Sequence, residues 1–450
     1  MHPWITKNLI YYPIQAYRGE RVKKSIAEIR TFHRLPREEM TRIQLGKLRS
    51  LMQFLYAKNP YYREIFDESG FDVRHIESSR DLERLPFLTK ADLNARSSEM
   101  LSQYSGRTSK RKTSGSTGIP LVFEKDRDAT AYMDALMYEV YSWHGIDIGD
   151  RQSRVWGVPL DTTGKMTTRI KDILLNRRRL SSFKISDDDC TKYFKSMKSF
   201  KPAFMYGLPN TIASFASTLQ SAGYDPSELK IGVVITTGEI LTPVLRDSIA
   251  NAFNCRVVNE YGSTECGIIA FECSKGKLHL MNHNMIVEFV DPDTGEPVDE
   301  GQLGEVVLTE LHSYAMPFVR YRVGDMARPI GGKCECGLES PLVEEVVGRV
   351  SDLIHTPEGK RVNSALLSYS MPPQVLQFRS IQKNAGKLEV FLKVRGEFDN
   401  SHIAGIERRL RKQLGDAIRI EIMTVDEIPP EKSGKFRHFV SEMEVQTNRS

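Results

Sequence analysis

The spacing of apolar residues predicts a helical N-terminal region. Within residues 20–70, five apolar side chains recur at helical spacing: Leu45, Leu48, Leu51, Met52 and Leu55. Asn59-Pro60 then predicts the end of that helix, because proline cannot continue it. We therefore expect residues 1–70 to be a helical N-terminal region, with further helices at 127–143 and 210–221.

Short apolar runs alternate with these helices. Residues 231–237 predict a buried strand that ends in a glycine turn at Gly238, and residues 256–259 form a similar run. Short apolar strands that alternate with helices are typical of α/β proteins with largely parallel sheets. The predicted fold class for this part of the chain is therefore α/β.

The pattern changes near residue 285. Residues 286–290 and 304–309 are strand-like runs on either side of a turn, which predicts a β-rich subdomain over about 273–345. Beyond residue 350, three strand-like runs and a helix at 401–414 predict a compact α+β unit. We expect a large N-terminal domain at 1–350 and a small C-terminal domain at 351–450.

Length and composition agree with two domains in an ordinary globular protein. The chain has 450 residues, of which 40% are hydrophobic and 27% are charged. A net charge of +5 suits anionic ligands such as ATP or CoA, but it is too weak to indicate nucleic acid. Neither a secretory signal nor an 18-residue apolar run is evident, so we expect a cytoplasmic protein with reduced cysteines.

The N-terminal segment has a second interpretation. Trp4, Leu9 and Tyr12 stand beside basic residues such as Lys7 and Arg18, and an aromatic, basic helix can lie on a membrane surface. The alternative is that this helix packs on the protein body.

Residues 113–120 carry the most informative motif, Thr-Ser-Gly-Ser-Thr-Gly-Ile-Pro. Glycines, hydroxyls and backbone N–H groups at this density can bind phosphate oxygens. The loop is not a Walker A motif, because no Gly-Lys-[Ser/Thr] follows. The expected phosphate ligands lie in one run: Ser114, Gly115, Ser116, Thr117 and Gly118.

Three further motifs follow in fixed order at 259–265 (Asn-Glu-Tyr-Gly-Ser-Thr-Glu), 321–325 (Tyr-Arg-Val-Gly-Asp) and 432–437 (Lys-Ser-Gly-Lys-Phe-Arg). Together with the loop, they resemble the adenylate-forming superfamily of acyl- and aryl-CoA ligases. Within it, the chain is most similar to the phenylacetate–CoA ligase group, in the branch named for capsular polysaccharide biosynthesis. The resemblance implies a large N-terminal domain, a mobile C-terminal lid, and an active site between them.

The resemblance also implies roles for individual residues. Thr264 and Glu265 match positions for phosphate contact and Mg²⁺ coordination, and Asp325 matches the aspartate that holds the ribose hydroxyls. Arg349 matches an arginine near the hinge that approaches the ribose or phosphate. The remaining matches on the adenosine side are Gly238, Glu239, Glu260, Tyr261 and Gly262.

Lys435 is the predicted catalytic residue, since its ammonium is a compact cation for the α-phosphate and the substrate carboxylate. One departure concerns the hinge. Two residues after Arg349 the family usually has a charged pivot, but this chain has Ser351, followed by Asp352. Either the register is shifted by one residue or the hinge is weaker.

The resemblance implies ATP-dependent activation of a carboxylic acid as acyl-AMP, followed by transfer to CoA or another acceptor. The implied acyl pocket includes Tyr206, Gly207 and Cys266, and its largely apolar lining favours an aromatic or medium-chain acid. A carrier-protein thiol or the amine of an amino sugar is an alternative acceptor. A non-catalytic nucleotide-binding partner in surface polysaccharide biosynthesis is an alternative function, and homodimerisation stays open.

A second group of residues indicates a metal. Five residues separate Cys273 from His279, and Cys334-Glu-Cys336 supplies two more thiols. Such a set can close a tetrahedral Cys₃His zinc site, which would be structural because four protein ligands leave no open position. The alternative is a set of reduced cysteines without a metal.

Overall fold

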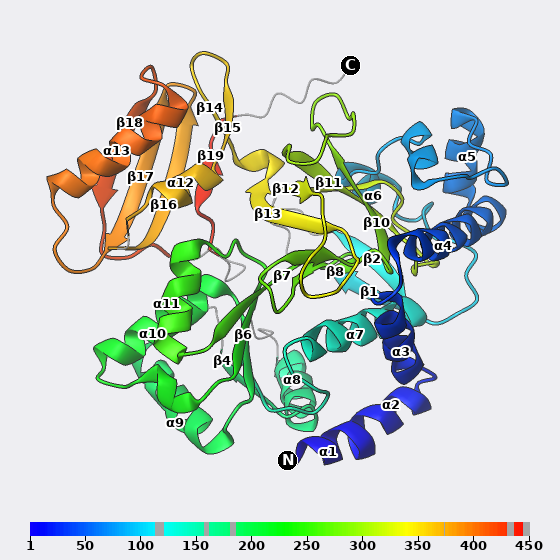
Figure 1. Cartoon of the computed structure of the whole chain (residues 1–450), viewed down its shortest axis with the longest axis horizontal. Helices are drawn as coiled ribbons and strands as arrows, with labels where there is room; N and C mark the ends of the chain where they lie inside the picture. The colour runs from blue at the N-terminus through cyan, green and yellow to red at the C-terminus, as the bar shows by residue number, and fades with distance from the viewer. Residues whose placement is uncertain (113–120, 157–161, 181–185, 373, 430–435, 444–450) are drawn as a thin grey trace.

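The computed structural model describes residues 1–112, 121–156, 162–180, 186–372, 374–429 and 436–443. Helices dominate the N-terminal region, as predicted (Figure 1). Asn59 caps two of them, since it ends one helix and its side chain accepts the Tyr62 N–H of the next at 3.1 Å. The helical elements here are α1 (Pro3–Ile5), η1 (Thr6–Tyr11), α2 (Tyr12–Tyr17), α3 (Val22–Phe32), α4 (Arg37–Lys58), α5 (Pro60–Ser69), η2 (Ser79–Arg84) and α6 (Lys90–Arg96).

An eleven-stranded mixed sheet forms the centre of the large domain, in the order β10-β11-β12-β13-β9-β8-β7-β6-β5-β3-β4. The five strands from β7 to β4 run parallel, and the pairs from β7 to β10 are antiparallel. The parallel strands are β3 (Gln152–Val155), β4 (Arg177–Leu180), β5 (Phe204–Gly207), β6 (Val233–Thr237) and β7 (Arg256–Ser263). The others are β8 (Gly267–Glu272), β9 (Leu278–Leu280), β10 (Met285–Val290), β11 (Gly304–Glu310), β12 (Tyr321–Ile330) and β13 (Leu342–Arg349).

Helices cover both faces of the parallel half of the sheet. One core cluster packs helices against Met205, Val234 and Val257, and another packs a helix against Phe204 and Ile235 on the opposite face. Strands buried on both faces read as continuous apolar runs, which explains the strand predicted at 231–237. The helices are α7 (Arg127–Ser142), α8 (Thr162–Leu174), α9 (Asp187–Phe200), α10 (Pro209–Ser221), η3 (Pro226–Leu229) and α11 (Pro243–Phe253).

The β-rich segment is not a separate sheet. β13 pairs with β9 through Leu342 and His279, so β10–β13 extend the main sheet beyond its parallel half. The predicted strand–turn–strand is present as the antiparallel pair β10 and β11. The pairing of β13 with β9 joins residues 63 positions apart, so the local sequence pattern cannot predict it.

A two-stranded hairpin brackets the predicted phosphate loop. β1 (Thr108–Lys112) and β2 (Val122–Asp126) are antiparallel, with Lys112 opposite Val122. Residues 113–120 between them lie outside the described residues. The hairpin is fixed to the body by Asp126, which caps α7 and accepts the Tyr314 N–H at 2.8 Å.

The C-terminal domain has its own core, at the upper left of Figure 1. A four-stranded sheet in the order β18-β17-β16-β19 packs against helices α12 and α13. The predicted fold class, α/β with a separate α+β unit, is confirmed. The elements are η4 (Val350–Asp352), β14 (Leu353–His355), β15 (Arg361–Asn363), α12 (Ala365–Ser370), β16 (Val375–Asn384), β17 (Lys387–Val394), α13 (Asn400–Leu414), β18 (Arg419–Thr424) and β19 (Phe439–Ser441).

Candidate active site and metal centre

The carboxyl ends of β5, β6 and β7 meet at one edge of the sheet, where α/β proteins usually bind ligands. Glu260 of β7 lies there, and its carboxylate accepts the hydroxyls of Tyr141 at 3.0 Å and Tyr206 at 3.1 Å. Burial raises the pKa of Glu260, while these hydroxyl donors lower it. The carboxylate thus holds Tyr206 at the edge of the predicted acyl pocket.

The predicted ribose ligand lies beside the predicted adenine contact. The Tyr261 hydroxyl donates to Asp325 Oδ2 at 3.0 Å. Arg349 stands opposite Asp325 across β12 and β13, with its Nε 3.7 Å from Asp325 Oδ1. Burial raises the pKa of Asp325 to about 6, against the opposing effects of Arg349 and Tyr261. Three residues from three strands therefore converge on one small region.

Thr264 and Glu265 occupy the tight turn between β7 and β8. Gly262 allows this turn, because a Cβ there would lie 2.7 Å from the Gly267 carbonyl oxygen. The Glu265 side chain accepts the Tyr321 hydroxyl at 3.4 Å, and its main-chain oxygen accepts Lys125 Nζ at 2.9 Å. Lys125, on strand β2 of the hairpin that brackets residues 113–120, thus holds the Glu265 turn in place.

Lys125 is itself fully buried and pairs with the fully buried carboxylate of Glu310. The sequence did not single out either residue. The one sequence feature that could have indicated Lys125 is its charge within a strand-like run after the Ser/Thr/Gly loop.

Two predicted groups lie outside the described residues: the loop Ser114, Gly115, Ser116, Thr117 and Gly118, and Lys435. The residue after Lys435 is described. The Phe436 N–H donates to Glu239 Oε1 at 2.6 Å, and Asn210 Nδ2 donates to the other oxygen of that carboxylate at 3.0 Å. Glu239 therefore links the two domains beside Gly238, at the end of β6.

The hinge contacts are made by Asp352. Its Oδ2 accepts the Arg349 N–H at 3.3 Å, and its Oδ1 pairs with Arg437 at 3.1 Å. Asp352 thus joins the hinge to the segment that follows Lys435, in agreement with a register shifted by one residue from Ser351.

The other predicted acyl-pocket residues have packing roles in the structure. A Cβ at Gly207 would lie 2.3 Å from the Val155 carbonyl oxygen, so the glycine lets β5 approach β3. Cys266 is fully buried within the apolar core cluster around β8, and burial raises its pKa well above the usual value. Contact with an acyl group stays a prediction for both residues.

Sequence reasoning missed Arg154, on β3. Its guanidinium lies 4.7 Å from the centre of the Tyr206 ring and 5.7 Å from that of Trp156. Its Nε is buried and has no hydrogen-bond partner in the described part of the chain. Burial lowers the pKa of Arg154, and repulsion from the neighbouring charge of Arg177 lowers it further. A guanidinium with a buried Nε thus lies beside Tyr206, whose hydroxyl Glu260 accepts.

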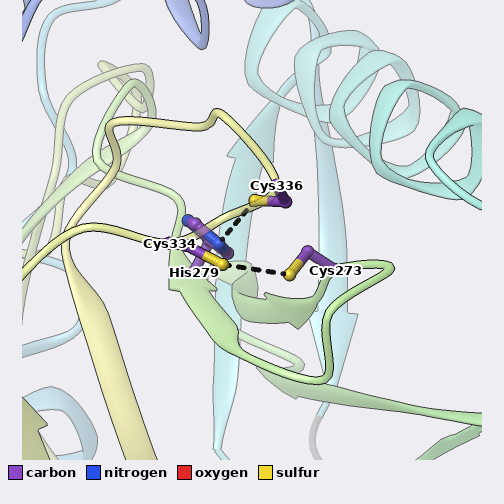
Figure 2. A group of neighbouring side chains, drawn as sticks. All are labelled: Cys273, His279, Cys334 and Cys336. Atoms are coloured by element: carbon purple, nitrogen blue, oxygen red, sulfur yellow. Dashed lines mark hydrogen bonds between the residues drawn. The ribbon is translucent and has the colours of Figure 1, made fainter.

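The four predicted metal ligands come together, as Figure 2 shows. Cys273 lies after β8, His279 lies on β9, and the pair Cys334 and Cys336 lies in the loop between β12 and β13. Their ligand atoms all lie within 4.8 Å of one another. Burial lowers the pKa of His279 to about 4, so its ring is neutral near pH 7, as a metal ligand requires.

The distances fit a tetrahedral ion. Zn–S bonds of about 2.3 Å place two sulfurs on a tetrahedron about 3.8 Å apart. Cys273 Sγ and Cys334 Sγ are 3.7 Å apart, and Cys336 Sγ is 3.3 Å from His279 Nε2. The Lys275 N–H also points to the Cys273 sulfur at 3.4 Å, a donor that favours a thiolate. The four side chains therefore suit zinc.

Comparison with protein families gives two matches. A profile of the AMP-binding enzyme family matches residues 113–312, and one of the CapK C-terminal domain matches residues 354–442. The chain is 24% identical to phenylacetate-coenzyme A ligase of Thermus thermophilus, over 90% of this chain and 96% of that protein. It is 22% identical to Protein CapK of Staphylococcus aureus, over 90% and 89%.

Solved structures of 2-hydroxyisobutyryl-CoA ligase share the fold. The postadenylation state with its acyl-AMP superposes with a TM-score of 0.76 at 19% identity, over 92% of each chain. The thioesterification state of the same enzyme, with acyl-AMP and CoA, gives 0.61 at 20% identity and the same coverage. The domain arrangement described above is thus closer to the postadenylation state.

The fold, the site and these matches together define an adenylate-forming enzyme, which confirms the predicted ligase class. Enzymes of this class activate a carboxylic acid with ATP and then transfer the acyl group, so the predicted type of reaction is confirmed as well. Within the class, the chain is similar to phenylacetate–CoA ligases and to Protein CapK over about 90% of its length, and its C-terminal domain matches the CapK profile.

Proposed function

We propose that this protein joins a carboxylic acid to the α-phosphate of ATP and transfers the acyl group to CoA. The observation that carries the proposal is the convergence of Tyr261, Asp325 and Arg349 beside the Glu265 turn, at the carboxyl edge of the sheet. Described residues next to the two remaining motifs contact the same region: Lys125 of the hairpin donates to the Glu265 main chain, and the Phe436 N–H donates to Glu239.

Each residue is assigned the role that its motif implies. Asp325 holds the ribose hydroxyls, and Tyr261 orients that carboxylate while lying against the adenine. Ser114–Gly118 and Thr264 donate to the phosphates. Glu265 would hold Mg²⁺, which neutralises phosphate charge when bound. Lys435 stabilises the charge that develops on the α-phosphate.

We further propose that the acid carries an electronegative or anionic group on its tail. The apolar lining alone favours an aromatic or medium-chain acid, but Arg154 places a guanidinium with a buried Nε beside Tyr206, and this Nε has no hydrogen-bond partner among the described residues. A buried donor without an acceptor is costly, and a carboxylate, hydroxyl or carbonyl on the acid would satisfy it.

An ATP–pyrophosphate exchange assay over matched acids tests both proposals, because it does not depend on the acceptor. The panel pairs each simple acid with its hydroxy and dicarboxylic counterparts. We expect exchange with at least one acid and a preference for the substituted member. Arg154→Met should remove that preference. If no acid supports exchange although ATP binds, a non-catalytic nucleotide-binding role would replace the proposed activity.

CoA is the favoured acceptor because the whole large domain and the lid match CoA ligases in fold. Loss of free CoA thiol in the presence of ATP and the identified acid measures the transfer. Exchange without thiol loss would favour a carrier-protein thiol or an amino-sugar amine instead.

We also propose one structural zinc on Cys273, His279, Cys334 and Cys336. The tetrahedral fit of the sulfur and nitrogen atoms supports this assignment. Because the ligands come from two distant segments, the metal would fasten the β12–β13 loop to the β8–β9 hairpin. Metal analysis of untagged protein should give about one zinc per chain. Less than about a tenth of an equivalent, with thiols alkylated under native conditions, would contradict the proposal.

A further inference from the structure

Exposed apolar side chains gather on two helical segments far from the active site. Residues 3–17, formed by α1, η1 and α2, expose Trp4 (58%) and Leu9 (61%). Helix α8 exposes Met166, Ile170 and Ile173. Together, residues 1–17 and α8 hold nine of the thirteen large apolar residues that are exposed in the described part of the chain.

Both segments expose apolar side chains to solvent, which is unusual for helices that only pack on the protein body. Such helices bury their apolar stripe. In residues 3–17 the buried side chains are Thr6, Tyr11 and Gln15, and of these three Tyr11 alone joins an apolar core cluster. Among residues 166–174 of α8, whose side chains are described, Asp172 is buried, while Ile170 and Ile173 are exposed. The same inversion on two helices indicates that the outward faces have a partner.

The two segments adjoin. Asn176, directly after α8, donates from Nδ2 to the Met1 carbonyl oxygen at 3.1 Å. Met1 and Ile173 line one groove of about 530 Å³ together with Arg169 and Arg178. Figure 1 likewise shows α1 at the lower end of α8. The N-terminus and the end of α8 therefore adjoin, and their exposed apolar residues Met1 and Ile173 share one groove.

The surface is strongly basic. Residues 1–24 and 162–179 contain eleven Lys and Arg against two acidic residues, although the net charge of the whole chain is only +5. The remainder of the chain is therefore acidic overall. Four arginines line the groove with a single acid, Asp172, whose carboxylate is already paired with Arg179 at 2.9 Å.

We propose that residues 1–24 and 162–179, which comprise α8 and the start of β4, form a docking surface for an anionic lipid bilayer. Aromatic and aliphatic side chains such as Trp4 and Ile170 would enter the headgroup boundary, and the surrounding Lys and Arg would contact lipid phosphates. No helix in the described part of the chain is long and apolar enough to cross a bilayer, so the contact is interfacial. A second copy of the chain is disfavoured, because two equally basic faces would repel.

Flotation with lipid vesicles tests the proposal on the full chain. We expect binding to vesicles containing phosphatidylglycerol and none to phosphatidylcholine alone, with loss of binding at high salt. The double variant Trp4→Ser/Leu9→Ser should lower partitioning about tenfold, and Ile170→Ser/Ile173→Ser should do the same. Arg178→Glu, which reverses one charge, should lower it by more than about fivefold.

Matched variants at other exposed positions distinguish binding through this surface from nonspecific binding to lipid. Tyr56→Ser and Met423→Ser remove exposed apolar side chains, and Arg408→Glu reverses an exposed charge on α13. These controls should bind vesicles like wild type. All variants should keep the wild-type melting temperature and ATP affinity, since the substituted side chains make no contact with the described residues of the proposed nucleotide site. Absence of flotation, equal losses in the controls, or a dimer that the Trp4/Leu9 variant dissociates would each overturn the proposal.

Discussion

Replacing Asp325 by Asn is expected to weaken nucleotide binding while leaving the fold intact. The carboxylate accepts Tyr261 at 3.0 Å and lies 3.7 Å from Arg349, so two neighbours already orient it toward the proposed ribose site. The amide keeps the same shape but loses the charge. Hydrogen bonds to a charged acceptor contribute about 1.5–3 kcal/mol each, and part of this is offset by water in the free protein. We therefore expect the Kd for ATP to rise about 10- to 100-fold.

The raised pKa of Asp325 gives this prediction a distinctive pH dependence. The pKa is about 6 in the folded protein and near 3.8 in the unfolded chain, so an ionised Asp325 costs stability and the cost grows as pH rises through this window. Ligand binding has the opposite sign, because the ionised form is the better acceptor. Adenosine affinity should be full above pH 7 and fall as pH drops through 6. Adenosine is the preferred probe because it has no phosphate that titrates.

Calorimetric titration of wild type, Asp325→Asn and Tyr261→Phe measures these effects. Tyr261→Phe serves as the control, since it removes one orienting hydroxyl and leaves the carboxylate; its loss should be only a few-fold. Asp325→Asn should bind weakly with no pH dependence near 6, and its Tm at pH 7 should equal or exceed that of wild type. An unchanged affinity for Asp325→Asn would make Asp325 a structural residue and refute the ribose assignment.

Three further changes have defined outcomes. Lys435→Ala should slow adenylation by about two to four powers of ten with nearly unchanged ATP affinity, and an unimpaired exchange rate would remove its catalytic role. Cys336→Ser should lower the zinc content and speed hydrogen exchange in residues 273–336 before it affects ATP binding, whereas unaltered exchange would mean that packing alone holds this region. Lys125→Met should lower the free energy of unfolding by about 3–5 kcal/mol because it strands the buried Glu310, and Lys125→Met/Glu310→Leu should recover much of that loss in urea denaturation. Additive losses in the double variant would show that the two charges do not interact.

Much of the fold follows from local pattern. Strands buried on both faces, such as β6, gave continuous apolar runs, and helices such as α13 gave amphipathic spacing. The sheet as a whole was less accessible. Whether β10–β13 form their own layer depends on the pairing of Leu342 with His279, and a short strand of three residues carries little pattern of its own.

The candidate site divides in the same way. Ordered motifs identified Tyr261, Glu265 and Asp325, and the Cys and His spacing identified the metal cluster, because these residues are grouped along the chain. Arg154 and the Lys125–Glu310 pair depend on which side of a strand faces which neighbour, so no local motif marks them. The contact between the N-terminal segment and α8 could not be predicted either. The sequence of residues 1–17 alone suggests a membrane contact, but α8 lies beside this segment only in the folded structure.

The position of β13 has a consequence for how the chain is made. This strand lies between β12 and β9, so without it the central sheet would be two unconnected pieces. At a synthesis rate of about 5–20 residues per second, several seconds pass between the emergence of β9 and that of β13 from the ribosome. Throughout that interval β9 has a bare edge that can pair with another nascent chain. A protein truncated before Leu342 should therefore aggregate, whereas one that ends just after Arg349 contains β13 and can complete the sheet.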